Sequence, residues 1–277
     1  MSFAGHTARK RFGQHWLRDE QVLDRILESA ALEEGDRVLE VGPGRGALTD
    51  RLLKSPAELV HAIELDRDLV SGLTERYGAQ SRFSLCEGDV LNVPLTLPDG
   101  CPASKVVANI PYNITGPLLE RLIGRLDRPV DPPYERLILL VQKEVAERIR
   151  APAGHSSFSA LSVRLQLLAR CQTVCPVPPR CFQPPPKVQS EVIRLDPLPA
   201  DQRPDPDLCR GVERLLKQAF LARRKMLRNT LAGVKPPDQL QELAQQAGID
   251  LQQRPQDVAP ENWVALARGL RAAEASE

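Results

Sequence analysis

The sequence lacks any hydrophobic run long enough to cross a membrane. Its apolar stretches are short, such as "LILLV" at residues 137–141, whereas a transmembrane helix needs about 18 or more consecutive apolar residues. The basic residues near the N-terminus precede no apolar segment, which is not typical of a secretory signal. We therefore expect a soluble, cytoplasmic protein with no membrane partner.

Cysteines at metal-binding spacings are also missing. No two of the six cysteines form a C-x-x-C pair, and their spacings differ from those of common zinc sites. They are Cys86, Cys101, Cys171, Cys175, Cys181 and Cys209. We therefore expect free, mostly buried thiols and no bound metal.

The chain has little net charge, +1 over 277 residues, and this value alone favours neither the presence nor the absence of a nucleic-acid partner. Two segments depart from the balance. The charged residues of segment 1–18 are all basic: Arg9, Lys10, Arg11 and Arg18. Segment 210–228 contains seven bases and one acid, Glu213. These seven are Arg210, Arg214, Lys217, Arg223, Arg224, Lys225 and Arg228. Such patches suit phosphate contacts, although a solvated helix face gives the same pattern.

Apolar residues make up 42% of the chain, enough for one large domain or for a large and a small one. Helical and strand-like patterns alternate from residue 19 to residue 142, which predicts a doubly wound α/β fold with a parallel sheet. Helices are expected at 19–31, 47–53, 67–77 and 116–126, and strands at 37–41, 59–65, 82–89, 104–109 and 136–142. A late strand at 190–198 is expected to close the sheet. Prolines at 197–206 then predict a boundary between domains at residues 1–200 and 201–277, the second one helical.

A glycine-rich loop follows the first predicted strand, in "VLEVGPGRGALTD" at residues 38–50. Gly42, Gly44 and Gly46 would let the backbone approach a ligand at the start of the next helix. The NAD fingerprint would place its third glycine at Ala47. A tight turn without a ligand remains an alternative at this point.

Two acidic residues lie at the carboxyl ends of the next two predicted strands. Glu64 could accept hydrogen bonds from both ribose hydroxyls of a nucleoside, and Asp89 could accept one from an adenine amino group. Either carboxylate alone could instead be a helix cap. Because ligands bind at the carboxyl edge of such a sheet, the loop and both acids together indicate a nucleoside-containing cofactor, NAD or S-adenosylmethionine.

The stretch "VVANIPYNITGP" at residues 106–117 distinguishes these cofactors. Its "NIPY" is similar to the [DN]-x-P-Y signature of methyltransferases that modify exocyclic amino groups. The side-chain oxygen of Asn109 and the carbonyl of Ile110 could accept both hydrogens of an adenine N6, a nitrogen that is otherwise a poor nucleophile. Pro111 fixes the chain direction, and Tyr112 could stack on the base, a contact worth about 1–3 kcal/mol.

Most of the chain resembles the ribosomal RNA adenine dimethyltransferase family. The matching segments, in the family's order, are "ARKRFGQHWL", "EVGPGRGALT", "IELDRDL", "EGDVL", "NIPYNIT", "VQKEVAERI", "FQPPPKVQS" and "ARRKMLRNTL". The resemblance implies a Rossmann-like class I S-adenosylmethionine-dependent methyltransferase domain and a small helical RNA-binding domain. It implies N6,N6-dimethylation of two adjacent adenosines in a hairpin near the 3′ end of 16S rRNA, in the small ribosomal subunit, and a role in late 30S subunit assembly. We expect a monomer.

The resemblance also assigns roles to individual residues. Cofactor contacts fall on His15, Leu17, Gly42, Gly44, Gly46, Glu64, Asp89 and Asn109. Phe182 would lie on the opposite face of the target base from Tyr112, so that two rings hold an unstacked adenine. Lys187, the N-terminal bases Arg9, Lys10 and Arg11, and the seven bases of residues 210–228 are expected to contact RNA phosphates. The sequence departs from the family at three positions. His15 stands where the family often has Asn, Trp16 where it usually has Phe, and Ile110 where it usually has Leu.

Three alternatives remain open. One is a sister methyltransferase that acts on large-subunit (23S) rRNA and confers antibiotic resistance. Another is a nucleotide-binding enzyme that is not a methyltransferase, such as a dehydrogenase built on the glycine loop. The third is a ribosome-assembly factor whose catalysis is secondary.

Overall fold

The computed structural model describes residues 14–275. The predicted RNA-binding residues Arg9, Lys10 and Arg11 therefore lie outside the described residues. The chain divides into two compact units. The first contains the chain up to Ile123, Asp131–Ala146 and Cys171–Pro197, and the second contains Gly124–Val130, Glu147–Arg170 and the chain from Leu198 onward. The predicted boundary at residue 200 lies close to the start of this last segment, but two earlier segments also belong to the second unit.

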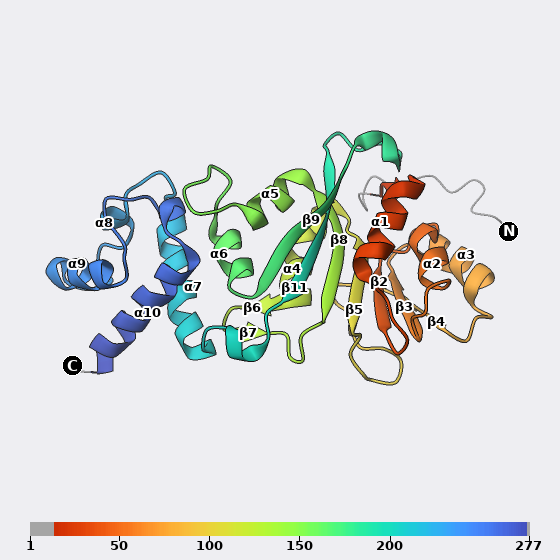
Figure 1. The fold of residues 1–277 in the computed structure, drawn as a ribbon, viewed down its shortest axis with the longest axis horizontal. Helices are drawn as coiled ribbons and strands as arrows, with labels where there is room; N and C mark the ends of the chain where they lie inside the picture. Colours follow the sequence, from red (N-terminus) through yellow and green to blue (C-terminus); the bar gives the residue numbers. More distant parts are fainter. Residues whose placement is uncertain (1–13, 276–277) are drawn as a thin grey trace. The chain divides into compact units, whose positions relative to one another are not determined.

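The first unit is built on a seven-stranded sheet (Figure 1). In spatial order its strands are β4 (Phe83–Glu87), β3 (Leu59–Glu64), β2 (Arg37–Val41), β5 (Lys105–Asn109), β8 (Arg136–Gln142), β11 (Ser190–Pro197) and β9 (Ala169–Val177). The pairs from β4 to β8 are parallel, as the alternating sequence pattern predicted. The late strand predicted at 190–198 is β11, which runs antiparallel to β8, so the sheet as a whole is mixed. No α-helix joins β9 to β11, and a parallel neighbour normally needs such a crossover.

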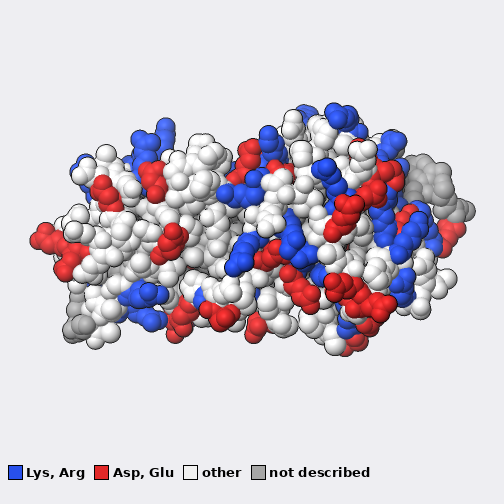
Figure 2. Space-filling model, viewed as in Figure 1, with Lys and Arg blue, Asp and Glu red and all other residues white. Residues whose placement is uncertain are grey.

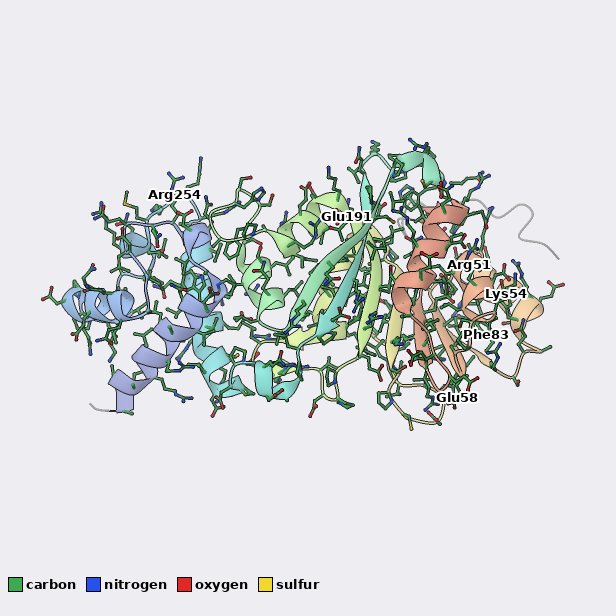
Figure 3. The ribbon with its side chains drawn as sticks, in the orientation of Figure 1. Arg51, Lys54, Glu58, Phe83, Glu191 and Arg254 are labelled. Atoms are coloured by element: carbon green, nitrogen blue, oxygen red, sulfur yellow. The ribbon has the colours of Figure 1, made fainter. Side chains whose placement is uncertain are left out.

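Alternating strand residues turn one face of this sheet toward the N-terminal helices. Val38, Val107 and Ile138 belong to a buried cluster that also contains residues of α1 (Glu20–Ala30), α2 (Ala47–Leu52) and α3 (Arg67–Tyr77). Arg51 of α2, labelled in Figure 3, donates to Asp24 of α1 at 3.0 Å. This unit also contains a 3-10 turn at Tyr112–Ile114, which leads into α4 (Thr115–Ile123). Packing of helices on the sheet thus leaves its carboxyl edge to the strand-end loops.

A two-stranded pairing fixes the chain just before α1. In it, β1 (Trp16–Leu17) runs antiparallel to β10 (Phe182–Gln183). Leu17 and Phe182 are paired in register and are each 4% exposed. The backbone N–H of Arg18 donates to the carbonyl of Cys181 at 2.8 Å. This pairing therefore holds the N-terminal segment at the carboxyl edge of the sheet.

Asp19 begins α1 as its N-cap and provides a test of local stability. Its Oδ1 accepts the backbone N–H of Val22 at 3.1 Å, and its Oδ2 accepts the thiol of Cys181 at 3.3 Å. The Val22 bond, followed by the thiol bond, holds the pKa of Asp19 below its usual value. We expect Asp19→Ala to lower the free energy of unfolding at neutral pH by about 1 kcal/mol, measured by urea denaturation.

The pH dependence of this effect follows from the lowered pKa. A carboxylate with a depressed folded-state pKa stabilises the fold above its unfolded value, about 3.9, and loses this effect as the pH falls through its folded value. The difference between wild type and Asp19→Ala should therefore shrink below about pH 3.9. Asp19→Asn, which keeps an acceptor, serves as the control and should cost only a few tenths of a kcal/mol at neutral pH. An equal loss in both variants would contradict the capping role.

The second unit is mainly helical, as predicted for the C-terminal part of the chain. Its helices are α6 (Ala160–Gln166), α7 (Pro206–Phe220), α8 (Leu227–Thr230), α9 (Pro237–Gln246), α10 (Pro260–Ala275) and the second half of α5 (Lys143–Arg150), and its short strands are β6 (Gly124–Arg125) and β7 (Arg128–Pro129). Helix α10 packs against α7 and α9. Trp263 of α10 is fully buried and provides the largest side chain of this core.

The basic segment at residues 210–228 does not form one continuous helix. Arg210, Arg214 and Lys217 are exposed on α7, opposite its buried apolar stripe. The spacing of Arg224 and Arg228 from the bases of α7 would place them all on one side of a continuous helix. Helix α7 ends at Phe220, so these two do not share its face. Figure 2 shows basic and acidic side chains interspersed over the visible face, as expected from the small net charge.

Two further observations concern membranes and metals. Between residues 14 and 275, no helix is both long and apolar enough to span a membrane. In the same part of the chain, no three His, Cys, Asp or Glu side chains are grouped as metal ligands would be. All six cysteines are free, with Cys175, Cys181 and Cys209 buried and Cys101 exposed.

Candidate cofactor and adenine-binding site

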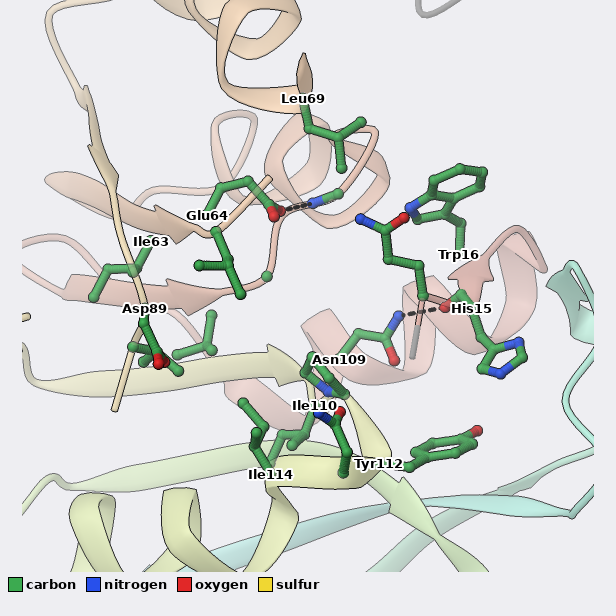
Figure 4. A pocket seen from close by; sticks show the side chains of 18 of the residues that line it. His15, Trp16, Ile63, Glu64, Leu69, Asp89, Asn109, Ile110, Tyr112 and Ile114 are labelled. Carbon is green, nitrogen blue, oxygen red and sulfur yellow. Dashed lines mark hydrogen bonds between the residues drawn. The ribbon is translucent and has the colours of Figure 1, made fainter. Parts of the chain in front are cut away.

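A pocket lies at the carboxyl edge of the sheet, where β2, β3 and β5 end (Figure 4). Nine of the predicted cofactor and catalytic residues line it: His15, Gly42, Gly44, Glu64, Asp89, Asn109, Ile110, Pro111 and Tyr112. Leu17, Gly46 and Phe182 are not among its lining residues. The pocket also has the location at which ligands bind to sheets of this kind.

The glycine loop approaches the pocket with a backbone that only glycine adopts without strain. Gly42 and Gly44 have φ angles of 69° and 59°. A Cβ on Gly44 would lie 2.9 Å from the ring of Trp16, too close for any real side chain. The guanidinium of Arg45 lies 3.9 Å from the centroid of the same ring, a cation–π contact. Trp16 therefore lies directly against the loop, which restricts position 44 to glycine.

Gly46 has a different role from the one predicted. Its φ is 82°, and a Cβ there would lie 2.4 Å from the hydroxyl oxygen of Tyr77. That hydroxyl donates to the Gly46 carbonyl at 3.2 Å. The third glycine thus makes room for a side chain of α3 rather than for the pocket.

A fully buried acid, Glu40, connects the two elements on either side of the glycine loop. Glu40 of β2 accepts a hydrogen bond from the Thr49 hydroxyl of α2 at 2.8 Å. Burial raises the pKa of Glu40 to about 8, so this carboxyl is mostly protonated at neutral pH. It joins the strand before the glycine loop to the helix after it, a structural role that the sequence reading did not identify.

Glu64 ends β3 and reaches the glycine loop. Its Oε2 accepts the backbone N–H of Gly44 at 3.0 Å, drawn as a dashed line in Figure 4, and its Oε1 accepts the N–H of Asp66 at 2.9 Å. Burial raises the pKa of Glu64, although both N–H donors oppose the shift. Each carboxyl oxygen has a second lone pair that could accept a ligand hydroxyl.

Asp89 marks the other end of the pocket and is held by its own turn. Its two oxygens accept the N–H of Leu91 and the amide of Asn92, both at 2.9 Å. Between it and Glu64 the wall is apolar, formed by Ile63, Leu65, Leu69, Val90 and Ile114. These apolar residues were not predicted. Leu65 is 47% exposed. A leucine directly after an acid that ends a strand was the one sequence feature that could have indicated this apolar wall.

Asn109 ends β5 at the middle of the pocket. Its Nδ2 donates to the backbone carbonyl of His15 at 3.0 Å (Figure 4). The next N–H along the chain, that of Ile110, donates to the Leu140 carbonyl of β8 at 3.2 Å. Pro111, with a φ of −57°, then starts the 3-10 turn. The signature "NIPY" is therefore fixed on both sides, by the N-terminal segment and by the sheet.

The ring of Tyr112 is held and is partly covered. Its hydroxyl shares a 2.5 Å hydrogen bond with Ser190 of β11. The His15 imidazole stacks on the ring with the centroids 5.6 Å apart and the planes at 26°. A base inserted between the two rings would need two stacking distances of about 3.4 Å, and together these exceed the separation of the rings. A base that stacks on this face of Tyr112 therefore has to displace the imidazole, which donates through Nδ1 to the Pro184 carbonyl at 2.8 Å.

Phe182 does not lie beside Tyr112 as predicted, because its side chain is buried in the hydrophobic core. Leu17 is also buried in this core, but it lines a second hollow next to the glycine loop together with Gly42 and Asn109. The ring beside Tyr112 belongs to His15 instead of Phe182. Lys187 is exposed on the loop before β11.

The sequence of this chain matches a known protein family over nearly its whole length. Residues 5–271 match the family described as ribosomal RNA adenine dimethylase. The chain belongs to this family. Its membership confirms the predicted fold class and the prediction of an S-adenosylmethionine-dependent rRNA adenine methyltransferase.

Similar proteins cover the dimethylase chain from end to end. "Ribosomal RNA small subunit methyltransferase A" of Synechococcus sp. (strain WH7803) is 76% identical and covers 100% of this chain and 99% of its own length. The protein of that name from Prochlorococcus marinus (strain MIT 9313) is 70% identical, over 99% and 98% of the two chains.

Solved structures of similar sequence also cover both domains of this dimethylase. A dimethyladenosine transferase from Plasmodium falciparum is 26% identical with a TM-score of 0.73, over 91% of this chain and 96% of its own. The 23S rRNA methyltransferase ErmE is 26% identical with a TM-score of 0.71, over 92% and 99% of the two chains. A dimethyladenosine transferase and a 23S rRNA methyltransferase therefore share this fold.

Proposed function

We propose that this dimethylase adds two methyl groups to N6 of each of two adjacent adenosines in a hairpin near the 3′ end of 16S rRNA. The observation that carries the proposal is one pocket in which Asn109 and Tyr112 adjoin the glycine loop and Glu64. The choice of the small subunit is supported by the full-length relatives at 67–76% identity. A substrate inside ribosomal subunits supports a location in the cytoplasm and a role in late subunit assembly.

The pocket suits S-adenosylmethionine, which supplies an activated methyl group when it is bound. Gly42 and Gly44 present backbone without side chains, which leaves room for the amino-acid part of the cofactor. Glu64 accepts the ribose hydroxyls, and the apolar wall takes the adenine ring, whose amino group donates to Asp89. Burial of Glu64 strengthens such hydrogen bonds, because little water competes for its oxygens.

The chain's contribution to methyl transfer is positioning and desolvation. The Oδ1 of Asn109 and the carbonyl of Ile110 accept the two N6 hydrogens and direct the nitrogen toward the methyl donor. Tyr112 supports the base after the His15 imidazole has turned aside. An amide has no basicity for this proton, so the proton leaves to water after transfer. The same contacts accept the monomethylated amine, which still has one hydrogen to donate.

Exposed bases of both units are proposed to contact RNA phosphates. Lys187 lies on the loop that follows β10, and Arg214 and Lys217 lie on the exposed side of α7. Arg224, Lys225 and Arg228 are exposed beyond that helix. Two others are partly engaged, since Arg210 pairs with Asp207 at 2.5 Å and Arg223 donates to the Ser156 carbonyl. We propose that the enzyme acts as a monomer, because cofactor and base sites lie within one chain.

The test is transfer of labelled methyl groups to purified, undermethylated small subunits, with the modified nucleotides mapped. We expect label on N6 of two adjacent adenosines near the 3′ end of 16S rRNA, at a stoichiometry of about four methyl groups per subunit. Large subunits serve as the comparison substrate. Label confined to 23S rRNA would overturn the proposal in favour of the resistance-type enzyme.

A further inference from the structure

The direction of the Asn109 amide is decided by its neighbour. A carbonyl oxygen can only accept a hydrogen bond, so the group 3.0 Å from the His15 carbonyl must be the amide nitrogen, Nδ2. The acceptor Oδ1 is therefore turned away from His15. With the opposite orientation, two oxygens would face each other at this distance.

The His15 carbonyl is itself held in place by backbone contacts. Trp16 pairs with Gln183 in the β1–β10 ribbon, and the N–H of Arg18 donates to Cys181 at 2.8 Å. Leu17, between them, is buried at 4% exposure. These contacts do not involve the imidazole, so the carbonyl keeps its position when the His15 ring leaves Tyr112.

We propose that the backbone carbonyl of His15 is a positioning group, which takes the Nδ2 donor of Asn109 so that Oδ1 alone is offered to the substrate amine. The inference rests on the proposed function and adds a reason for the residue type at position 109. An acceptor is needed on the substrate side and a donor on the His15 side. Only an uncharged amide supplies both at neutral pH, so the N-terminal segment excludes an ionised aspartate, the other residue that the [DN]-x-P-Y signature allows.

The variant Asn109→Asp separates this role from a general need for an acceptor. An ionised aspartate still offers an oxygen to the amine but places a second oxygen against the His15 carbonyl. A protonated aspartate restores the arrangement, because its O–H donates to the carbonyl and its other oxygen accepts. Partial burial and this carbonyl both favour the neutral form. The loss of methyl-transfer activity in Asn109→Asp should therefore diminish as the pH falls.

The first measurement is the rate of methyl transfer by Asn109→Asp divided by that of the wild type. We expect this ratio to rise at least about tenfold between about pH 8 and about pH 5.5, since the protonated fraction changes tenfold per pH unit above the pKa. The matched control is Asn113→Asp, the same change at an exposed residue on the rim of the same pocket. A solvated aspartate stays ionised above about pH 3.9, so the control ratio should stay constant. A constant ratio for Asn109→Asp as well would overturn the proposal.

The second measurement needs no substrate, so it remains informative if the wild type fails to methylate small subunits. The midpoint of thermal unfolding of Asn109→Asp should lie below that of the wild type at about pH 8 and approach it at about pH 5.5, because its folded-state pKa is raised. A variant that folds only at the lower pH would agree with this direction. A deficit of the same size at both pH values, or failure to fold at either, would contradict the orientation by His15.

Discussion

Asn109→Ala should lower kcat for methyl transfer about 10²- to 10³-fold, the range found when one positioned hydrogen-bond partner of a transition state is removed. The variant loses the Oδ1 acceptor that directs the amine, and it leaves the His15 carbonyl without its donor. The KM for S-adenosylmethionine should change much less, because the glycine loop and Glu64 remain. Single-turnover transfer of labelled methyl groups to small subunits measures the chemical step.

Two checks accompany this variant. Thermal unfolding shows whether the fold survives, and a subunit-binding assay shows whether the substrate still docks. Retained binding with lost transfer would also separate assembly from catalysis. A variant with a rate within threefold of the wild type would show that Asn109 does not have the proposed role in methyl transfer.

Glu64→Ala should weaken S-adenosylmethionine binding by about 10²- to 10³-fold, since hydrogen bonds to a charged group are worth about 1.5–3 kcal/mol each. The substitution also removes the acceptor of the Gly44 and Asp66 N–H groups. The loop would then lose its support together with the ribose contact. Isothermal titration calorimetry with S-adenosylmethionine measures the dissociation constant directly.

Glu87→Ala is the matched control for this second effect. Glu87 ends the neighbouring strand in register with Glu64, but it pairs with Arg67 at 2.6 Å and does not line the pocket. Its replacement should leave the dissociation constant within about twofold, because exposed ion pairs contribute little. Equal losses from both variants would show that charge near the sheet edge, rather than the ribose contact, governs affinity.

Local patterns were enough to predict the elements that carry the site. The strands Arg37–Val41 and Arg136–Gln142 and the helix Arg67–Tyr77 have the predicted bounds. Buried parallel strands appear as continuous apolar runs, and their carboxyl ends share one edge of the sheet. Glu64, Asp89 and Asn109 could therefore be placed in one pocket before the structure was known.

Contacts between distant segments could not be predicted in this way. Nothing local to Phe182 indicates that it pairs with Leu17 and turns inward, and the family resemblance suggested a place beside the base instead. The stacking of His15 on Tyr112 depends on the same pairing. Along residues 210–228 the helical spacing of the bases continues past Phe220, but the helix ends there. Charge periodicity alone does not maintain a helix.

The β1–β10 ribbon has a consequence for the order of events during synthesis. Arg18 and its hydrogen-bond partner Gln183 are 165 residues apart. At about 5–20 residues per second, the N-terminal segment is made roughly 8 to 33 s before the strand that receives it. The glycine loop, Glu64, Asp89 and Asn109 are all translated during that interval. The strand that holds the His15 segment in place is therefore made last, and each newly made chain acquires a complete pocket only after residue 183 has emerged.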